Sequence, residues 1–200
     1  MKIFLISGPA PLYTNTYLII TEKRNAVIVD PAASAEAYNR ILGEENAKLT
    51  HIFCTHGHFD HVDAAPVLRE QWKAELYCEA SDVQGNEEYP LTYADRNYPE
   101  GTPIEVDELK FIPWHTPGHT KGSVCILCGD LFFTGDTLFA GDTGRTDLPG
   151  GDHRQMVESC KKLMRLPVPA NAQVLPGHDE SSTYAYEMAN NYFITAMCQD

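Results

Sequence analysis

Basic residues are scarce in this chain of 200 residues, in which 15 lysines and arginines stand against 28 aspartates and glutamates. The formal net charge is −13. Sequence-independent binding to nucleic acid or to an anionic lipid surface depends on clustered Lys and Arg side chains. The sequence therefore predicts no nucleic-acid partner and no membrane partner, and it makes phosphate-rich polymers poor candidates for substrates.

Long apolar segments are also missing. No stretch approaches the roughly 20 apolar residues that a helix needs to span a bilayer. The apolar run at the start of the chain, Ile3 to Ile6, is too short for the hydrophobic region of a secretory signal. We therefore expect a cytoplasmic protein.

The six cysteines lack the spacing of a disulfide framework. Cys125 and Cys128 form a CxxC pair, a pattern found in redox and zinc sites, but they lie in an apolar, strand-like run without a second CxxC. Free cysteine commonly behaves as a small buried hydrophobic residue. We expect buried, reduced thiols at these positions.

Internal repeats, low-complexity tracts and linkers are absent as well, so the sequence predicts a single domain over residues 1–200. Short apolar, β-branched runs predict strands at residues 3–6, 16–20, 26–29, 49–54, 74–78, 109–113, 124–128, 131–134 and 173–175. Apolar residues at helical spacing predict helices at 34–46, 64–73, 152–166 and 184–196. This alternation indicates an α/β fold with sheets covered by helices, and the number of sheets stays open.

Histidines concentrate in the segment Thr55-His56-Gly57-His58-Phe59-Asp60-His61-Val62-Asp63, which holds three of the eight in the chain. In an extended segment, side chains two residues apart point in the same direction, so His56 and His58 can share one metal ion. Asp60 and His61 are adjacent and cannot easily share that direction, which leaves them for a second ion. Because neutral imidazole is the commonest biological metal ligand, the segment predicts a binuclear metal site rather than a polar surface loop.

Three further ionisable residues follow predicted strands, and glycine precedes each of them: His119, Asp136 and His178. Taken singly, such a residue is more commonly a turn histidine or a capping aspartate than a ligand. Taken together, the three supply the partners that the histidine-rich segment needs to complete two metal sites.

The combined pattern resembles the metallo-β-lactamase fold superfamily and, within it, the glyoxalase II (hydroxyacylglutathione hydrolase) branch. The similarity covers nearly the whole chain through HxHxDH at 56–61, TPGHT at 116–120, TGD at 134–136 and PGH at 176–178. The resemblance implies a four-layer αββα sandwich in which loops at one edge of the two sheets hold the metals. It also implies that this chain lacks the C-terminal helical domain of typical, longer glyoxalase II proteins.

The resemblance further implies two divalent ions with one ligand set each: His56, His58 and His119 for the first, and Asp60, His61 and His178 for the second. Asp136 would bridge them, because a carboxylate has two oxygens and a negative charge to offset two dications. Sets of three protein ligands leave a coordination position on each ion open for a water, as a catalytic site requires. The ligand types suit zinc, with iron and manganese as alternatives. Three histidines match no ligand position: His51, His115 and His153.

The expected reaction is hydrolysis. A water between two ions about 3.5–4 Å apart is deprotonated near neutral pH and attacks a carbonyl that one metal polarises. The catalytic residues would be Asp60, which could orient this bridging hydroxide, and Asp136. Because every motif histidine and aspartate is a ligand, no dedicated general acid remains, and leaving groups that depart as anions are favoured.

A thiolate, with a pKa of around 8.5, is such a leaving group. The sequence therefore predicts a binuclear thioesterase that acts on a small-molecule thioester. Lactamases of the same fold typically have Cys or Ser in place of Asp136, which argues against antibiotic hydrolysis as the main role. Metal identity, oligomeric state, acyl group and thiol carrier stay open.

Other functions also fit the motifs. Residues 144–152 resemble a loop of short bacterial glyoxalase II-like proteins, and a related GRTD segment occurs in persulfide dioxygenases, which use one iron on the same scaffold. Because those enzymes keep most of the histidine motif, a mononuclear iron persulfide dioxygenase is an alternative. Hydrolysis of a lactone or phosphoester is another. A non-catalytic, partner-binding relic of the fold is a third, and the intact ligand set argues against it.

Two further features bear on the substrate. Arg145 is a candidate contact for a substrate carboxylate, and pairing with Asp147 or Asp142 to order the loop is an equally good interpretation. In the irregular segment 81–101, the residues from Tyr89 to Tyr98 either wall the pocket or form a solvent-facing excursion anchored by aromatic side chains.

Overall fold

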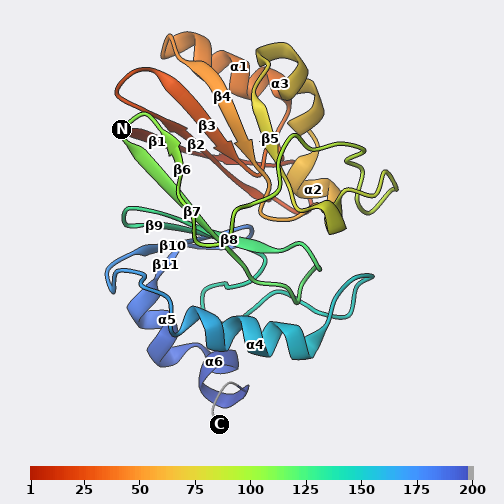
Figure 1. Ribbon diagram of the computed structural model, residues 1–200, viewed down its shortest axis with the longest axis vertical. Coiled ribbons are helices and arrows are strands. Elements are labelled where there is room, and N and C mark those ends of the chain that lie inside the picture. The colour runs from red at the N-terminus through yellow and green to blue at the C-terminus, as the bar shows by residue number, and fades with distance from the viewer. Residues whose placement is uncertain (198–200) are drawn as a thin grey trace.

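The computed structural model describes residues 1–197 and shows two β-sheets packed face to face, with helices on both outer sides (Figure 1). This is the four-layer αββα sandwich expected from the sequence motifs. Cys198, one of the six cysteines, lies outside the described residues.

The first sheet contains five strands in the spatial order in which they follow one another along the chain: β1 (Lys2–Ser7), β2 (Asn15–Ile20), β3 (Asn25–Val29), β4 (Lys48–Phe53) and β5 (Glu75–Tyr77). β1 to β3 pair antiparallel, and β3 to β5 pair parallel. Each parallel connection contains a helix on the outer face of the sheet: α1 (Ala35–Glu44) and α3 (Ala65–Trp72). Because β2 and β3 are covered on both faces, their sequences are continuous apolar runs rather than alternating ones.

The second sheet has the order β11-β10-β9-β8-β7-β6 and consists of β6 (Ile104–Val106), β7 (Leu109–His115), β8 (Val124–Cys128), β9 (Leu131–Gly135), β10 (Gln173–Pro176) and β11 (Ser182–Thr183). β9 and β10 are parallel neighbours, and the connection between them contains α4 (His153–Leu163). Three helices lie on the outer side of this sheet: α4, α5 (Tyr184–Asn190) and α6 (Tyr192–Met197) (Figure 1).

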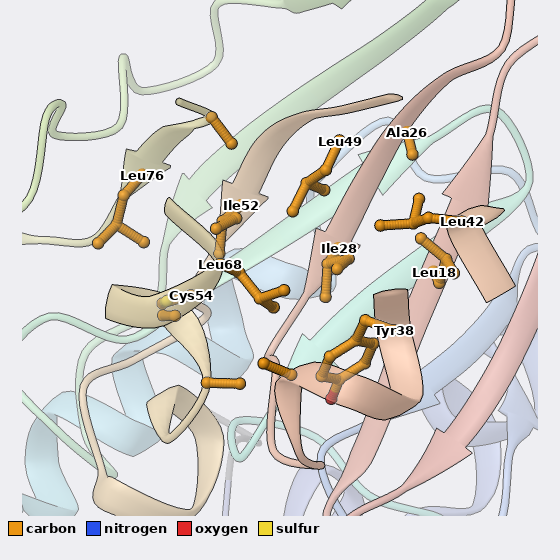
Figure 2. Packing of buried hydrophobic residues seen from close by; sticks show 14 of the residues in the cluster. Leu18, Ala26, Ile28, Tyr38, Leu42, Leu49, Ile52, Cys54, Leu68 and Leu76 are labelled. Atoms are coloured by element: carbon orange, nitrogen blue, oxygen red, sulfur yellow. The ribbon is translucent and has the colours of Figure 1, made fainter. Parts of the chain in front are cut away.

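Three apolar clusters separate the four layers. Figure 2 shows Ile28 and Ile52 of the first sheet packing near Tyr38 of α1 and Leu68 of α3. The second cluster lies between the sheets, where the rings of Phe53 and other aromatic residues meet edge to face. The third lies between the second sheet and its helices. Neighbouring residues of a strand point to opposite faces, so each buried strand contributes to two clusters.

The CxxC pair follows the same alternation. Cys125 packs in the cluster next to α4, whereas Cys128 packs between the sheets. Residues three apart on a strand face opposite sides, and this pair therefore cannot form a disulfide or share a metal ion. Cys125 and Cys128 are buried free thiols, as the sequence predicted.

The structure corrects the last predicted helix, 184–196, which is interrupted at Asn191. The backbone of Asn191 is extended after α5, and its side-chain Oδ1 accepts hydrogen bonds from the N–H groups of Phe193 (3.0 Å) and Ile194 (3.3 Å). Asparagine at this position caps the start of α6. Short elements without their own apolar period were also missed: α2 (Phe59–Val62), a 3-10 helix (Ala80–Asp82), β6 and β11. No helix within residues 1–197 has the length and apolarity to cross a bilayer.

Candidate metal centre

The predicted ligands converge at one edge of the sandwich, because each follows the end of a strand. The histidine-rich segment follows β4, and Asp60 and His61 lie on the short helix α2. His119 lies in the turn between β7 and β8, Asp136 directly after β9, and His178 shortly after β10. Both sheets therefore contribute side chains to one cluster.

Three imidazole nitrogens form the first ligand set. His58 Nδ1 lies 3.1 Å from His56 Nε2 and 2.9 Å from His119 Nε2. Tetrahedral coordination with Zn–N bonds of 2.0–2.1 Å separates the ligand atoms by about 3.3 Å. The spacing of the three nitrogens therefore suits a common divalent ion, as the sequence predicted for these residues.

The second ligand set contains Asp60, His61 and His178. His178 Nε2 lies 3.3 Å from His61 Nε2 and 3.3 Å from Asp60 Oδ2, and the latter is 3.6 Å from His61 Nε2. The carboxylate is held by the hydroxyl of Thr14, whose Oγ1 donates to Asp60 Oδ2 at 2.8 Å. These three atoms have the spacing of a second coordination site.

Asp136 lies between the two sets. Its Oδ2 is 3.4 Å from His119 Nε2 and 3.6 Å from His178 Nε2, and its Oδ1 is 3.5 Å from His61 Nε2. Among the side chains of residues 1–197, Asp136 Oδ1 is the buried polar atom without a hydrogen-bond partner. A buried carboxylate oxygen without a partner is costly, and a cation in the cluster would satisfy it. The donor set thus fits divalent metal binding.

Hydrogen bonds behind the histidines fix which ring nitrogen faces the cluster. Four rings have Nδ1 near an oxygen and Nε2 free: His56 with Thr55 Oγ1 (3.1 Å), His61 with Asp30 Oδ2 (3.0 Å), His119 with the Arg145 carbonyl (2.8 Å) and His178 with the Leu12 carbonyl (3.1 Å). His58 has the reverse orientation, with Nε2 3.2 Å from the Tyr89 hydroxyl and Nδ1 facing the cluster.

The two ligand sets differ in charge. Burial lowers the pKa of His56 well below its usual range and that of His58 to about 4, so both rings are neutral at pH 7. Burial also acts to lower the pKa of His61, but the charges of Asp136 and Asp30 outweigh it and raise that pKa to about 9. Burial opposes ionisation of Asp60, yet the hydrogen bond with His178 holds its pKa well below the usual range.

A cavity of about 510 Å³ opens beside the cluster. Its walls are largely apolar and include Leu12, Phe59, Phe139 and Leu148. Arg145 also lines it, and its guanidinium forms a two-bond ion pair with the Asp147 carboxylate at 2.7 and 2.8 Å. The pairing of Arg145 with Asp147 is therefore observed, and a contact with a substrate carboxylate stays a prediction.

Several residues that support the cluster were not predicted from the sequence. His51, His115 and His153 lie outside the candidate ligand groups found within residues 1–197. Asp30, a buried carboxylate directly after β3 that contacts His61 Nδ1, was not among the predicted site residues. Thr14 and Tyr89 had no sequence signal as supports of metal ligands. In the segment 81–101, Tyr89 and Tyr98 are buried and anchor it, whereas Tyr93 is exposed.

Comparison with known proteins decides the family. The sequence model of the metallo-beta-lactamase superfamily matches residues 9–178. The chain belongs to this superfamily. Hydroxyacylglutathione hydrolase GloC of Haemophilus influenzae is 30% identical over 198 residues, which cover 91% of this chain and 93% of that protein.

Two solved structures of similar chains support the same assignment. The structure of BLEG-1 B3 metallo-beta-lactamase has a TM-score of 0.87 at 30% identity and covers 98% of this chain and 100% of its own. TTHA1623 in a di-iron-bound form has a TM-score of 0.78 at 30% identity and covers 95% and 99%. The family and fold predicted from the motifs are confirmed, and the chain is a metallo-hydrolase of the metallo-beta-lactamase superfamily with a His/Asp metal-binding cluster.

Proposed function

We propose that the protein is a binuclear thioesterase of the glyoxalase II type that hydrolyses small acyl-thiol substrates. The observation that carries the proposal is the position of Asp136, whose two oxygens lie between two complete sets of protein ligands. The similarity to hydroxyacylglutathione hydrolase GloC supports the choice of substrate class.

The residues that would hold the ions are those of the two ligand sets, with Asp136 shared. When bound, two such ions lower the pKa of a coordinated water and polarise the substrate carbonyl. We expect zinc in both sites. Iron is the main alternative, which the di-iron form of the relative TTHA1623 supports, and manganese is a further one.

The side chains around the cavity support an anionic leaving group. Apart from the ligands, the titratable residues that line it within the described chain are Glu88 and Arg145. A guanidinium is always charged, and a carboxylate ionised at neutral pH has no proton to donate. A leaving amine would need such a proton, whereas a thiolate departs without one. The apolar walls at Leu12, Phe59 and Phe139 suit a small acyl or thiol group.

A second candidate is the mononuclear iron persulfide dioxygenase. It is favoured by the GRTD segment, whose Arg145 pairs with Asp147 and lines the cavity. Hydrolysis of a β-lactam is supported by the similarity to BLEG-1 but disfavoured by the aspartate at position 136. Hydrolysis of lactones or phosphoesters is a further alternative, which the substrate panel described next also tests.

The test combines metal analysis with a substrate panel. We expect about two metal ions per wild-type chain and hydrolysis of lactoylglutathione or a related thioester without oxygen uptake. Asp136→Asn should lose at least one ion and lower kcat/KM by about 100-fold or more, equivalent to about 2.7 kcal/mol of transition-state stabilisation. Asp130→Asn, at an exposed turn between β8 and β9, is the matched control and should leave both unchanged.

Two results would contradict the proposal. One is a metal-replete wild-type protein that is inert on a broad thioester panel. The other is one iron per chain with oxygen uptake on glutathione persulfide, which would establish the dioxygenase in its place.

A further inference from the structure

Two histidines of the first ligand set depend on one loop, residues 144–151. The carbonyl of Arg145 lies 2.8 Å from His119 Nδ1. The carbonyl of Pro149 accepts a hydrogen bond from the Tyr89 hydroxyl at 2.8 Å, and that hydroxyl lies 3.2 Å from His58 Nε2. The histidines of the second set are held elsewhere, by Asp30 and by the Leu12 carbonyl. The two sites therefore have separate supports.

Burial, a ring contact and backbone hydrogen bonds hold Tyr89 in its position. Its side chain is 2% exposed, and its ring lies 4.9 Å, centroid to centroid, from the His58 imidazole. Its backbone N–H donates to Asn86 Oδ1 at 2.8 Å, and the carbonyl of Glu88 accepts from the N–H of Phe59 at 3.0 Å. These bonds attach the segment 81–101 to the start of α2 directly beside His58.

The hydroxyl of Tyr89 packs against the 144–151 loop. A Cβ at Gly150 would lie only 2.9 Å from it, so this loop residue closes over the oxygen. Because the single hydroxyl proton goes to the Pro149 carbonyl, the oxygen can only accept from His58. The nearest carboxylate, Glu88, has Oε1 3.7 Å from His58 Nε2, beyond hydrogen-bond distance.

This direction of donation decides the tautomer of His58. Its proton lies on Nε2 and points to Tyr89, which leaves the lone pair of Nδ1 directed at His56 and His119. The other four histidines of the cluster would bind metal through Nε2 instead, because their Nδ1 atoms contact oxygens. His58 is thus the ligand whose ring orientation depends on a side chain from the segment 81–101.

We propose that Tyr89 is a positioning residue, which fixes the tautomer and orientation of His58 and couples the first metal site to the 144–151 loop. The inference rests on the proposed binuclear metal site. Arg145 and Leu148 of this loop line the substrate cavity. A metal ion in the first site therefore orders the wall that this loop forms, whereas the second site is joined to a different wall, at Leu12, through the contact of His178 with the Leu12 carbonyl.

Tyr89→Phe tests the inference, because it removes only the hydroxyl. Loss of a hydrogen bond behind a metal ligand typically costs about 10–100-fold in metal affinity, and we expect that loss at the first site alone. Thr14→Val is the corresponding variant for the second site, because the Thr14 hydroxyl donates to Asp60. It should weaken metal binding at the second site alone. Tyr184→Phe is the matched control, because it removes a buried hydroxyl that donates to the Leu163 carbonyl, far from the cluster.

The measurement is calorimetric titration of the metal-free proteins with Zn²⁺, together with amide hydrogen exchange of the 144–151 loop. Zinc should slow exchange in this loop in the wild type and in Thr14→Val, and much less in Tyr89→Phe. If the wild type does not bind two ions, the proposed binuclear site fails. If it does, and Tyr89→Phe weakens both sites alike, weakens neither, or leaves the protection of the loop unchanged, the role of Tyr89 is overturned.

Discussion

Glycine precedes four of the seven candidate metal ligands, and at Gly177 the reason is steric. A Cβ at this position would collide with Asp136 Oδ1 and lie 2.5 Å from His61 Cε1. At Gly135 the backbone has a φ of +49°, which disfavours other residues, and a Cβ there would collide with the Thr55 hydroxyl. The glycines at 135 and 177 therefore reflect the close packing of backbone against the cluster and its supporting residues.

The residue types and their spacing were sufficient to predict which side chains come together, because few other combinations are suited to bind divalent cations. All seven predicted side chains meet in the structure. Their supports were not predictable to the same degree. Thr14 and Tyr89 are ordinary turn residues in the sequence, and only the folded chain places their hydroxyls behind Asp60 and His58.

The protonation of His61 gives the metal-free protein a pH-dependent stability. Burial opposes the charge of this ring, but Asp136 and Asp30 raise its pKa from 6.5 to about 9. A pKa raised by folding contributes stability that is complete below the unfolded value and is lost as pH rises through the folded value. We therefore expect the free energy of unfolding to fall between about pH 6.5 and 9, by roughly 3 kcal/mol at most.

Denaturant unfolding in the presence of a chelator measures this effect. His61→Gln should show a smaller decrease over the same interval, with His178, whose pKa is also raised, accounting for part of the remainder. The lowered pKa values of His56 and His58 act only below this interval. A wild-type stability that is flat from pH 6.5 to 9 would contradict the prediction.

At the scale of elements, helix α4 supports the turn that holds His119. The N–H of Asp152 donates to the Gly118 carbonyl at 2.8 Å, directly before the helix begins. The backbone of Gly118 lies so close to α4 that a Cβ there would be 2.5 Å from the Met156 nitrogen. The start of α4 therefore fixes the position of the His119 turn relative to the second sheet.

Asp152 also caps this helix, because its Oδ1 accepts from the N–H groups of Arg154 (2.8 Å) and Gln155 (3.1 Å). Asp152→Ala should lower the free energy of unfolding by about 1 kcal/mol, the usual cost of losing an N-cap. For a chain of this size, that corresponds to a Tm lower by roughly 2–4 °C. Asp152→Asn keeps a capping oxygen and should lose much less; an equal loss in both variants would contradict the capping role.

The main elements were predictable from the sequence because their apolar periods are long enough to be distinctive. The strands with two covered faces, such as β2, β3 and β8, are continuous apolar runs. Elements of two to four residues, such as β11 and α2, have no period of their own. The break at Asn191 depends on hydrogen bonds that a periodic pattern does not contain.

At the scale of the molecule, each metal site takes ligands from both sheets. His56 and His58 follow the first sheet, whereas His119 belongs to the second. The other site likewise combines Asp60 and His61 with His178. A bound ion therefore cross-links the two halves of the sandwich at the edge where their apolar contact ends.

Removal of metal should lower the stability of the whole fold for this reason. A metal ion that binds only the folded state, at a concentration 1,000 times its Kd, adds about 4 kcal/mol. For a domain of this size the loss corresponds to a Tm lower by roughly 8–16 °C. Thermal unfolding before and after chelation measures it, and added Zn²⁺ should restore the original Tm. An unchanged Tm after complete metal removal would contradict the cross-link.

The sequence by itself determined the set of candidate ligands, the α/β class and the superfamily, because metal coordination limits residue types and spacing and because buried strands need continuous apolar runs. Tertiary structure decided which ring nitrogen of each histidine faces the cluster, that Arg145 pairs with Asp147, and that Tyr89 lies behind His58. These features depend on contacts between loops far apart in the chain. Each such contact requires two loops to be placed by the packing of the sheets, which no local pattern of residues specifies.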